Sequence, residues 1–127
     1  MAAVDTNVLV RLLVADDPVQ TKRAVAFLDS HRPVWISTVV LVETVWVLTL
    51  VYRWSKPQLV AMMHVAVASQ DFAFQSLAAV RAAVQLYVSG KADFADCLAL
   101  ELARSEGYLP FASFDKATAK LPDAVAP

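Results

Sequence analysis

Four acidic side chains border or interrupt strongly apolar segments of this chain, which restricts the folds that the chain can adopt. Asp5 follows the run MAAV, Glu43 lies within VVLVETVWVL, Asp96 precedes CLALELA, and Asp115 follows LPFASF. A carboxylate held in apolar surroundings is strongly destabilising unless its charge is compensated. The fold therefore has to supply a compensating cation, and the cations suited to a cluster of carboxylate oxygens are Mg²⁺ and Mn²⁺.

Short apolar runs alternate with segments that have helical character along the whole chain. Helix starts are marked by Asp17 before Pro18, by Ser37 or Thr38, by Ser55, by Ser76 and by Asp93, whereas Gly90 and Gly107 mark helix ends. These signals predict strands at 2–4, 34–36, 72–74 and 109–112, helices at 7–14, 18–31, 38–54, 55–69, 76–90 and 93–107, and a short turn or helix at 116–121.

Alternating strands and helices predict parallel strand pairing through right-handed crossovers. The expected fold class is α/β, with three α/β/α layers around a central parallel sheet of four or five strands, in a single domain that spans 1–127. Ligands of such folds bind at the carboxyl ends of the strands. Asp5 and Asp115 each follow a predicted strand, and Glu43 and Asp96 lie near the starts of predicted helices. The topology thus predicts that the four acids meet at one edge of the sheet.

Most of these acids also have an ordinary structural interpretation. Asp5 is suited to an Asx-turn, Asp115 to capping the KATAKL turn and Asp93 to an N-cap, while Asp96 complements the dipole of its helix. For each acid taken alone, we weigh the two interpretations about equally.

Glu43 has no such local role. It lies between Val42 and Thr44 in an apolar helix, and no basic residue occurs between Pro33 and Arg53. We therefore expect Glu43 to be buried without a basic partner near it in the sequence. The joint placement of all four acids then favours a functional site.

Composition limits the partners and the compartment. The chain is 58% hydrophobic and 18% charged, so we expect part of the apolar surface to be covered in a homodimer. With a net charge of −1, the chain lacks the broad basic surface with which many proteins neutralise nucleic-acid phosphates. Any nucleic acid must therefore be bound by a few basic residues near the site. The single cysteine, Cys97, fits the cytoplasm, and the longest apolar run is too short to span a membrane.

Four motifs carry a resemblance to a known family. In order and spacing, AVDTNVLVRLLVADDP, WISTVVLVETVWVL, ADFADCLALELA and FASFDKATAKL resemble the PIN-domain ribonucleases, and most closely the VapC-like toxins of bacterial type II toxin–antitoxin systems. The resemblance covers nearly the whole chain. It implies a PIN fold, metal-dependent endonuclease activity on RNA and inhibition by a cognate antitoxin protein.

The resemblance also implies roles for individual residues. It places the catalytic and metal-binding acids at Asp5, Glu43, Asp96 and Asp115, with Mg²⁺ or Mn²⁺ as the cofactor. The auxiliary positions that it implies are an acid at Asp93, polar residues at Thr6 and Asn7, and a small hydroxyl residue at Ser113. Pairing into homodimers is usual in this family.

Two other functional classes stay open. A Mg-dependent phosphatase with an aspartyl nucleophile also begins with a strand that ends in Asp, but it needs a second Asp two residues later, where this chain has Asn7. A catalytically inactive PIN-like binding module is the alternative that is not an enzyme, and its expected sign is a lost acid. For RNA contact, the basic residues nearest to the acids in the sequence are Arg11, Lys91 and Lys116.

Overall fold

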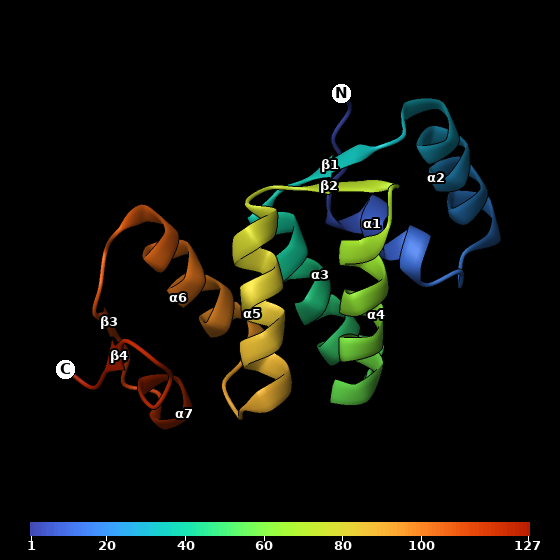
Figure 1. The fold of residues 1–127 in the computed structure, drawn as a ribbon. Coiled ribbons are helices and arrows are strands. Elements are labelled where there is room, and N and C mark those ends of the chain that lie inside the picture. Colours follow the sequence, from blue (N-terminus) through green and yellow to red (C-terminus); the bar gives the residue numbers. More distant parts are fainter. The chain divides into compact units, whose positions relative to one another are not determined.

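The computed structural model describes all residues, Met1–Pro127. The chain divides into two compact units, Met1–Gln75 and Ser76–Pro127. Both units combine helices with short parallel strands, which confirms the α/β class (Figure 1). None of the helices combines the length and the apolar character that crossing a membrane would require.

The first unit has a short parallel strand pair and four helices (Figure 1). β1 pairs with β2, with Val34 opposite Phe72 and Ile36 opposite Phe74. The strand predicted at 2–4 is reduced to a single parallel bridge between Ala3 and Trp35. The elements of this unit are α1 (Thr6–Leu13), α2 (Pro18–His31), β1 (Val34–Ile36), α3 (Thr38–Leu50), α4 (Lys56–Ala68) and β2 (Phe72–Phe74).

Side-chain caps explain where the helices of this unit begin. The Asp17 carboxylate accepts from the backbone N–H of Gln20, and Pro18 takes the first helical position of α2. Ser37 caps α3, and Ser55 forms a reciprocal capping box at the start of α4. The predicted starts of these helices are therefore confirmed, although α3 ends at Leu50, earlier than expected.

The second unit contains a helix pair followed by a small strand pair. α5 packs against α6, with Val80, Ala83 and Leu98 among the buried residues. β3 pairs in parallel with β4, a strand that the sequence did not predict. The elements of this unit are α5 (Leu77–Ser89), α6 (Phe94–Glu106), β3 (Phe111–Ala112), α7 (Lys116–Ala119) and β4 (Ala124–Val125).

A glycine explains the end of α6, whereas no side-chain cap explains the start of α5. Gly107 ends α6 in the left-handed conformation at φ 82°, as expected for a C-terminal glycine. Ser76 immediately precedes α5, so the predicted start of this helix is confirmed, although Ser76 has φ 54° and its side chain makes no capping hydrogen bond. Both sheets are two-stranded, and the central sheet of four or five strands stays a prediction.

Candidate functional site

Asp5 lies at the N-terminus of α1. Its Oδ1 accepts the backbone N–H of Val8 at 3.0 Å, which makes Asp5 the N-cap of this helix. The side chain is exposed, and Oδ2 has no donor within the protein. One oxygen therefore fixes the helix start while the other remains free for a ligand.

Glu43 is joined to the same helix end through Thr6. The hydroxyl of Thr6, the residue next to Asp5, donates to Oε2 of Glu43 at 2.8 Å. Thr6, an auxiliary residue that the family resemblance implied, thus connects Glu43 to the start of α1, where Asp5 lies.

The expectation that Glu43 is buried was wrong, because its side chain is exposed. The buried positions of α3 are Leu41, Thr44, Val45 and Leu48, which recur three and four residues apart on one face of the helix. Position 43 falls on the opposite face. The apolar residues on nearly every side of α3 concealed this periodicity in the sequence.

Asp96 and Asp115 approach one hydroxyl group in the second unit. Thr118 Oγ1 lies 2.8 Å from Asp115 Oδ2 and 3.2 Å from Asp96 Oδ2, and Thr118 itself is completely buried. The hydroxyl has a single proton, so it cannot donate fully to both carboxylates at once. Two carboxylates therefore share the single proton of this hydroxyl.

Asp115 also caps α7. Its Oδ2 accepts the backbone N–H of Thr118 at 2.9 Å, and its own N–H donates to Ser113 Oγ at 3.0 Å. The backbone N–H and the hydroxyl of Thr118 hold the pKa of the Asp115 carboxyl below its usual value. The charged form is thus favoured at the position where the resemblance implies a metal ligand, with Ser113 in contact with its backbone.

The remaining predicted residues have simpler surroundings. Asp93 is exposed and caps α6 through a 3.2 Å hydrogen bond from the N–H of Ala95, as its structural interpretation predicted. Asn7 is exposed in the first turn of α1. Among the basic candidates, Lys91 and Lys116 are exposed, whereas Arg11 is held by other side chains.

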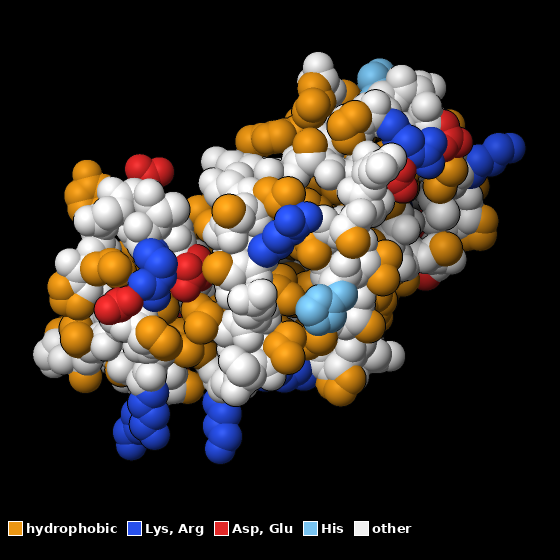
Figure 2. All heavy atoms as spheres, viewed as in Figure 1, with side chains coloured by type: hydrophobic (Ala, Val, Ile, Leu, Met, Phe, Trp, Pro, Cys, Tyr) orange, Lys and Arg blue, Asp and Glu red, His pale blue; other side chains and the backbone are white.

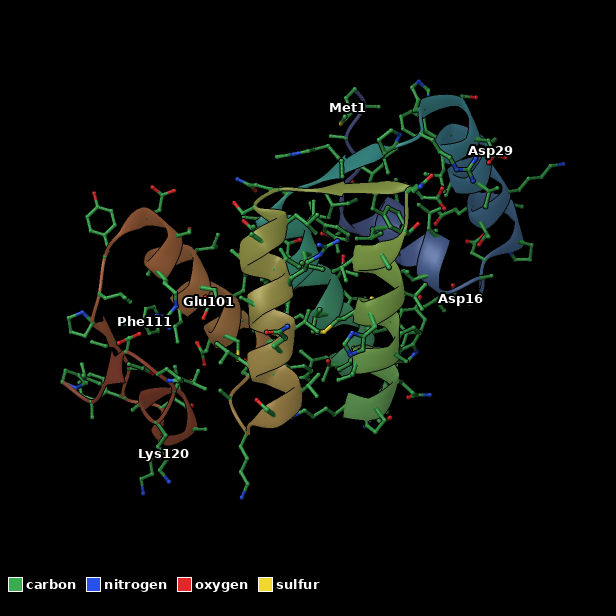
Figure 3. All side chains as sticks on the ribbon, in the orientation of Figure 1. Met1, Asp16, Asp29, Glu101, Phe111 and Lys120 are labelled. Carbon is green, nitrogen blue, oxygen red and sulfur yellow. The ribbon has the colours of Figure 1, made fainter.

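Arg11 belongs to a polar network between α1, α2 and Tyr52. Its guanidinium donates to Asp16, Gln20 and Tyr52 at 2.7–2.9 Å. Asp16, labelled in Figure 3, lies in the connection from α1 to α2. These contacts give Arg11 a structural function and leave less of its charge available for a ligand.

Sequence reasoning missed Thr118. The signal available was its position in SFDKAT, three residues after Asp115, where an N-cap carboxylate meets a backbone N–H. That rule predicts the backbone contact. It does not predict that the hydroxyl also reaches Asp96, 22 positions earlier in the chain.

Sequence reasoning also missed the one buried acid, Glu101. Only 8% of this residue is exposed, and it pairs with Arg104 at 3.2 Å. Arg104 also pairs with Asp123 and donates to the Pro122 carbonyl, so this cluster joins α6, which carries Glu101 (labelled in Figure 3), to the C-terminal segment. The charge of Glu101 is paired within the second unit, which indicates a structural role for this acid.

The acids of the predicted site have no basic partner of this kind. The ion pairs within the two units use Asp16, Asp29, Asp71, Glu101 and Asp123. None of them involves the four predicted metal-site acids, which leaves four negative charges without a cation.

The donor set suits a hard divalent cation. Two of the four predicted carboxylates lie in each unit, and within neither unit do three or more His, Cys, Asp or Glu side chains gather as a metal-binding group. Carboxylate oxygens are the ligands that Mg²⁺ and Mn²⁺ prefer. Helix capping by Asp5 and Asp115 engages one oxygen of each group and is compatible with metal binding by the other.

Comparison with known families identifies the family of this chain. The sequence model of the PIN domain matches residues 2–124. The chain belongs to the PIN domain family. Searches among curated proteins and among solved structures gave no match.

Membership in the PIN domain family indicates a general class of chemistry. PIN domains are generally nucleases, and they typically use divalent metal ions. The match extends over both units of the chain and includes all four acids of the predicted site. The family therefore confirms a nuclease-like fold.

Proposed function

We propose that this PIN domain is a metal-dependent endoribonuclease that acts as the toxin of a toxin–antitoxin pair. Asp5, Glu43, Asp96 and Asp115 together form its Mg²⁺ or Mn²⁺ site. The main support is the approach of Asp96 and Asp115 to the one hydroxyl of Thr118 without any basic partner. The proposal includes the single domain over 1–127 and the central sheet of four or five parallel strands.

The proposed site needs its carboxylates charged and held in fixed directions. The cap contacts of Asp5 and Asp115 fix one oxygen of each, and Thr6 and Thr118 orient Glu43 and Asp96 through their hydroxyls. These carboxylates would hold the divalent ion, and the chemistry that it would supply there is activation of water for hydrolysis of a phosphodiester. The expected products carry a 5′-phosphate and a 3′-hydroxyl.

The toxin assignment requires a partner that blocks the site. The first unit has an apolar groove of about 740 Å³, lined from α1, α2 and α4 by residues that include Leu12, Leu28 and Met62. An antitoxin with an apolar helix fits this groove, and an arginine in its tail would pair with the acids.

Homodimer formation is part of the same proposal. Val39, Trp46 and Leu50 on α3 are each at least 60% exposed, and they recur seven and four residues apart. Figure 2 shows hydrophobic side chains exposed between charged ones on the face drawn. An exposed apolar stripe of this kind is suited to contact with a second copy.

Cleavage of total cellular RNA tests the enzymatic part of the proposal. The purified protein is incubated with RNA in Mg²⁺, Mn²⁺ or EDTA, and the cut ends are mapped. Asp5→Asn and Asp96→Asn should each abolish cleavage while the fold survives. Asp29→Asn is the matched control, because Asp29 is an exposed acid that pairs with Arg32 outside the proposed site.

Three outcomes separate the candidates. Full cleavage by Asp5→Asn at ordinary metal concentration would refute the assignment of the acids. RNA binding without cleavage in any metal would favour the inactive binding module. Release of phosphate from monoesters without cutting of RNA would favour the phosphatase, although Asn7 already argues against it.

A further inference from the structure

A cleft that combines apolar and polar lining residues lies beside Asp5 in the first unit. It has a volume of about 890 Å³ and is lined by residues from the Ala3–Val4 segment, α1 and α2. Asp5 and Asn7 line it together with Ser30 and His31 of α2. The cleft therefore extends from a predicted catalytic acid along one side of α2.

The face of α2 that lines the cleft carries a cation without a protein partner. Gln20, Arg23 and Phe27 are three and four residues apart, which places them on one side of the helix. Gln20 is engaged by Arg11, whereas Arg23 is exposed and forms no ion pair or hydrogen bond. Arg23 is thus the cleft residue whose charge is available to a ligand.

Farther along α2, the same cleft has an exposed aromatic stack. The rings of Phe27 and His31 lie 4.1 Å apart between centroids with an interplanar angle of 18°. His31 Nδ1 is 2.9 Å from the Phe27 carbonyl oxygen, which holds the imidazole against the helix. Phe27 is 38% exposed. Figure 2 shows a His side chain together with basic and acidic side chains over α2.

We propose that this cleft binds the single-stranded RNA next to the cleaved bond. Arg23 contacts a backbone phosphate, and an unpaired base stacks on the Phe27–His31 pair. This inference rests on the proposed function, because it assigns the substrate path that leads to Asp5. The combination of a free guanidinium with an aromatic stack favours a single strand, since duplex RNA has no free base face to offer.

The chain has few basic residues to bind RNA phosphates, and the location of the cleft indicates which one can do so. A chain with charge −1 needs local cations wherever RNA passes its acidic site. Arg11 is close to Asp5 in the sequence, but its guanidinium is largely engaged by Asp16, Gln20 and Tyr52. Closeness in the sequence to the acids therefore does not identify the residue that binds the RNA phosphates. Arg23 is farther along the chain but lines the same cleft as Asp5.

Binding of a fluorescein-labelled single-stranded oligoribonucleotide tests the inference. Anisotropy is measured with the full chain in EDTA, which separates binding from cleavage, over a series of salt concentrations. Arg23→Gln should weaken binding about 3- to 10-fold and lower the salt slope by about 1, whereas Arg23→Lys should retain most of the affinity. Phe27→Leu should weaken binding about 5-fold with an unchanged salt slope.

Lys22→Gln is the matched control. Lys22 is an exposed cation next to Arg23 on α2, and it does not line the cleft. Its loss should change affinity less than about 2-fold. Equal effects of Lys22→Gln and Arg23→Gln, or absence of RNA binding by the unchanged protein, would overturn the inference.

The result is distinguishable from that of the cleavage experiment. If Asp5→Asn abolishes cleavage while Arg23→Gln behaves like Lys22→Gln, the nuclease proposal stands and the cleft assignment fails. If the protein binds RNA through Arg23 but cuts nothing, the cleft stands as an RNA-binding site and the nuclease proposal fails.

Discussion

Replacing Thr118 with Val removes one buried hydroxyl from α7 in the second unit and keeps the approximate volume of the side chain. In the structure this hydroxyl contacts Asp115 at 2.8 Å and Asp96 at 3.2 Å, and Thr118 is completely buried. Valine preserves the packing and removes only the donor. We expect two separable effects, one on stability and one on the response to metal.

The size of the stability effect follows from the hydrogen bonds that valine cannot make. A hydrogen bond to a charged group contributes about 1.5–3 kcal/mol, but Asp115 is exposed and water can replace the missing donor. We therefore expect the Thr118→Val protein to unfold more easily by about 1–2 kcal/mol, which lowers Tm by roughly 4–8 °C for a chain of this length.

The effect on the metal comes from orientation. Side chains that position a metal-binding carboxylate typically change metal affinity or activity by about 10- to 100-fold. If Asp96 and Asp115 bind the ion, Thr118→Val should raise the Mg²⁺ or Mn²⁺ concentration needed for half-maximal RNA cleavage about 10-fold. The metal-induced rise in Tm should shrink correspondingly at a fixed ion concentration.

The assay compares thermal unfolding in EDTA and over a metal titration, together with cleavage of RNA. Thr44→Val is the control, because Thr44 is also completely buried but its hydroxyl donates only to the Val40 carbonyl of its own helix at 2.7 Å. Thr44→Val should leave the metal dependence unchanged. If both variants show the same metal dependence, Thr118 has only a structural role and the reasoning is refuted.

Three further predictions concern charge, pH and assembly. In EDTA, Asp96→Asn should raise Tm, because it removes one of two neighbouring negative charges; a lower Tm would contradict this. Asp115 has a lowered pKa, so its stabilising charge is complete above the unfolded-state pKa and is lost as the pH falls through the folded-state value. The free energy of unfolding of Asp115→Asn should therefore lie below that of the unchanged protein at neutral pH, and the difference should narrow as the pH falls through the lowered pKa of Asp115, as measured by urea unfolding. Light scattering at micromolar concentration should give the mass of a homodimer, and Trp46→Glu should shift the mass toward a monomer because it places a charge in the exposed apolar stripe; a monomer mass for the unchanged protein would rule out the dimer.

Helix starts could be predicted from the sequence because their causes are local. An N-cap carboxylate or hydroxyl contacts a backbone N–H two or three residues later, so Asp17, Ser37 and Ser55 identify three helices without knowledge of the fold. Ser76 shows the limit of this rule, since its left-handed backbone directs the chain into α5 without a side-chain cap.

The strands depended more on partners distant in the chain. The apolar run at 2–4 has strand character, yet only Ala3 forms a bridge, to Trp35. β4 is a two-residue strand that exists because Phe111 and Ala112 lie opposite Ala124 and Val125. Strand formation requires hydrogen bonds between segments, so short sequences of this kind do not determine it alone.

For the candidate site, the sequence by itself determined which acids are present and that each lies near a helix start or a strand end. Only the tertiary structure decided how their oxygens are engaged. It placed Glu43 on the exposed face of α3 against Thr6, and it brought the Thr118 hydroxyl between Asp96 and Asp115. The physical reason is that capping is set within one helical turn, whereas burial and shared hydrogen bonds depend on how distant segments pack.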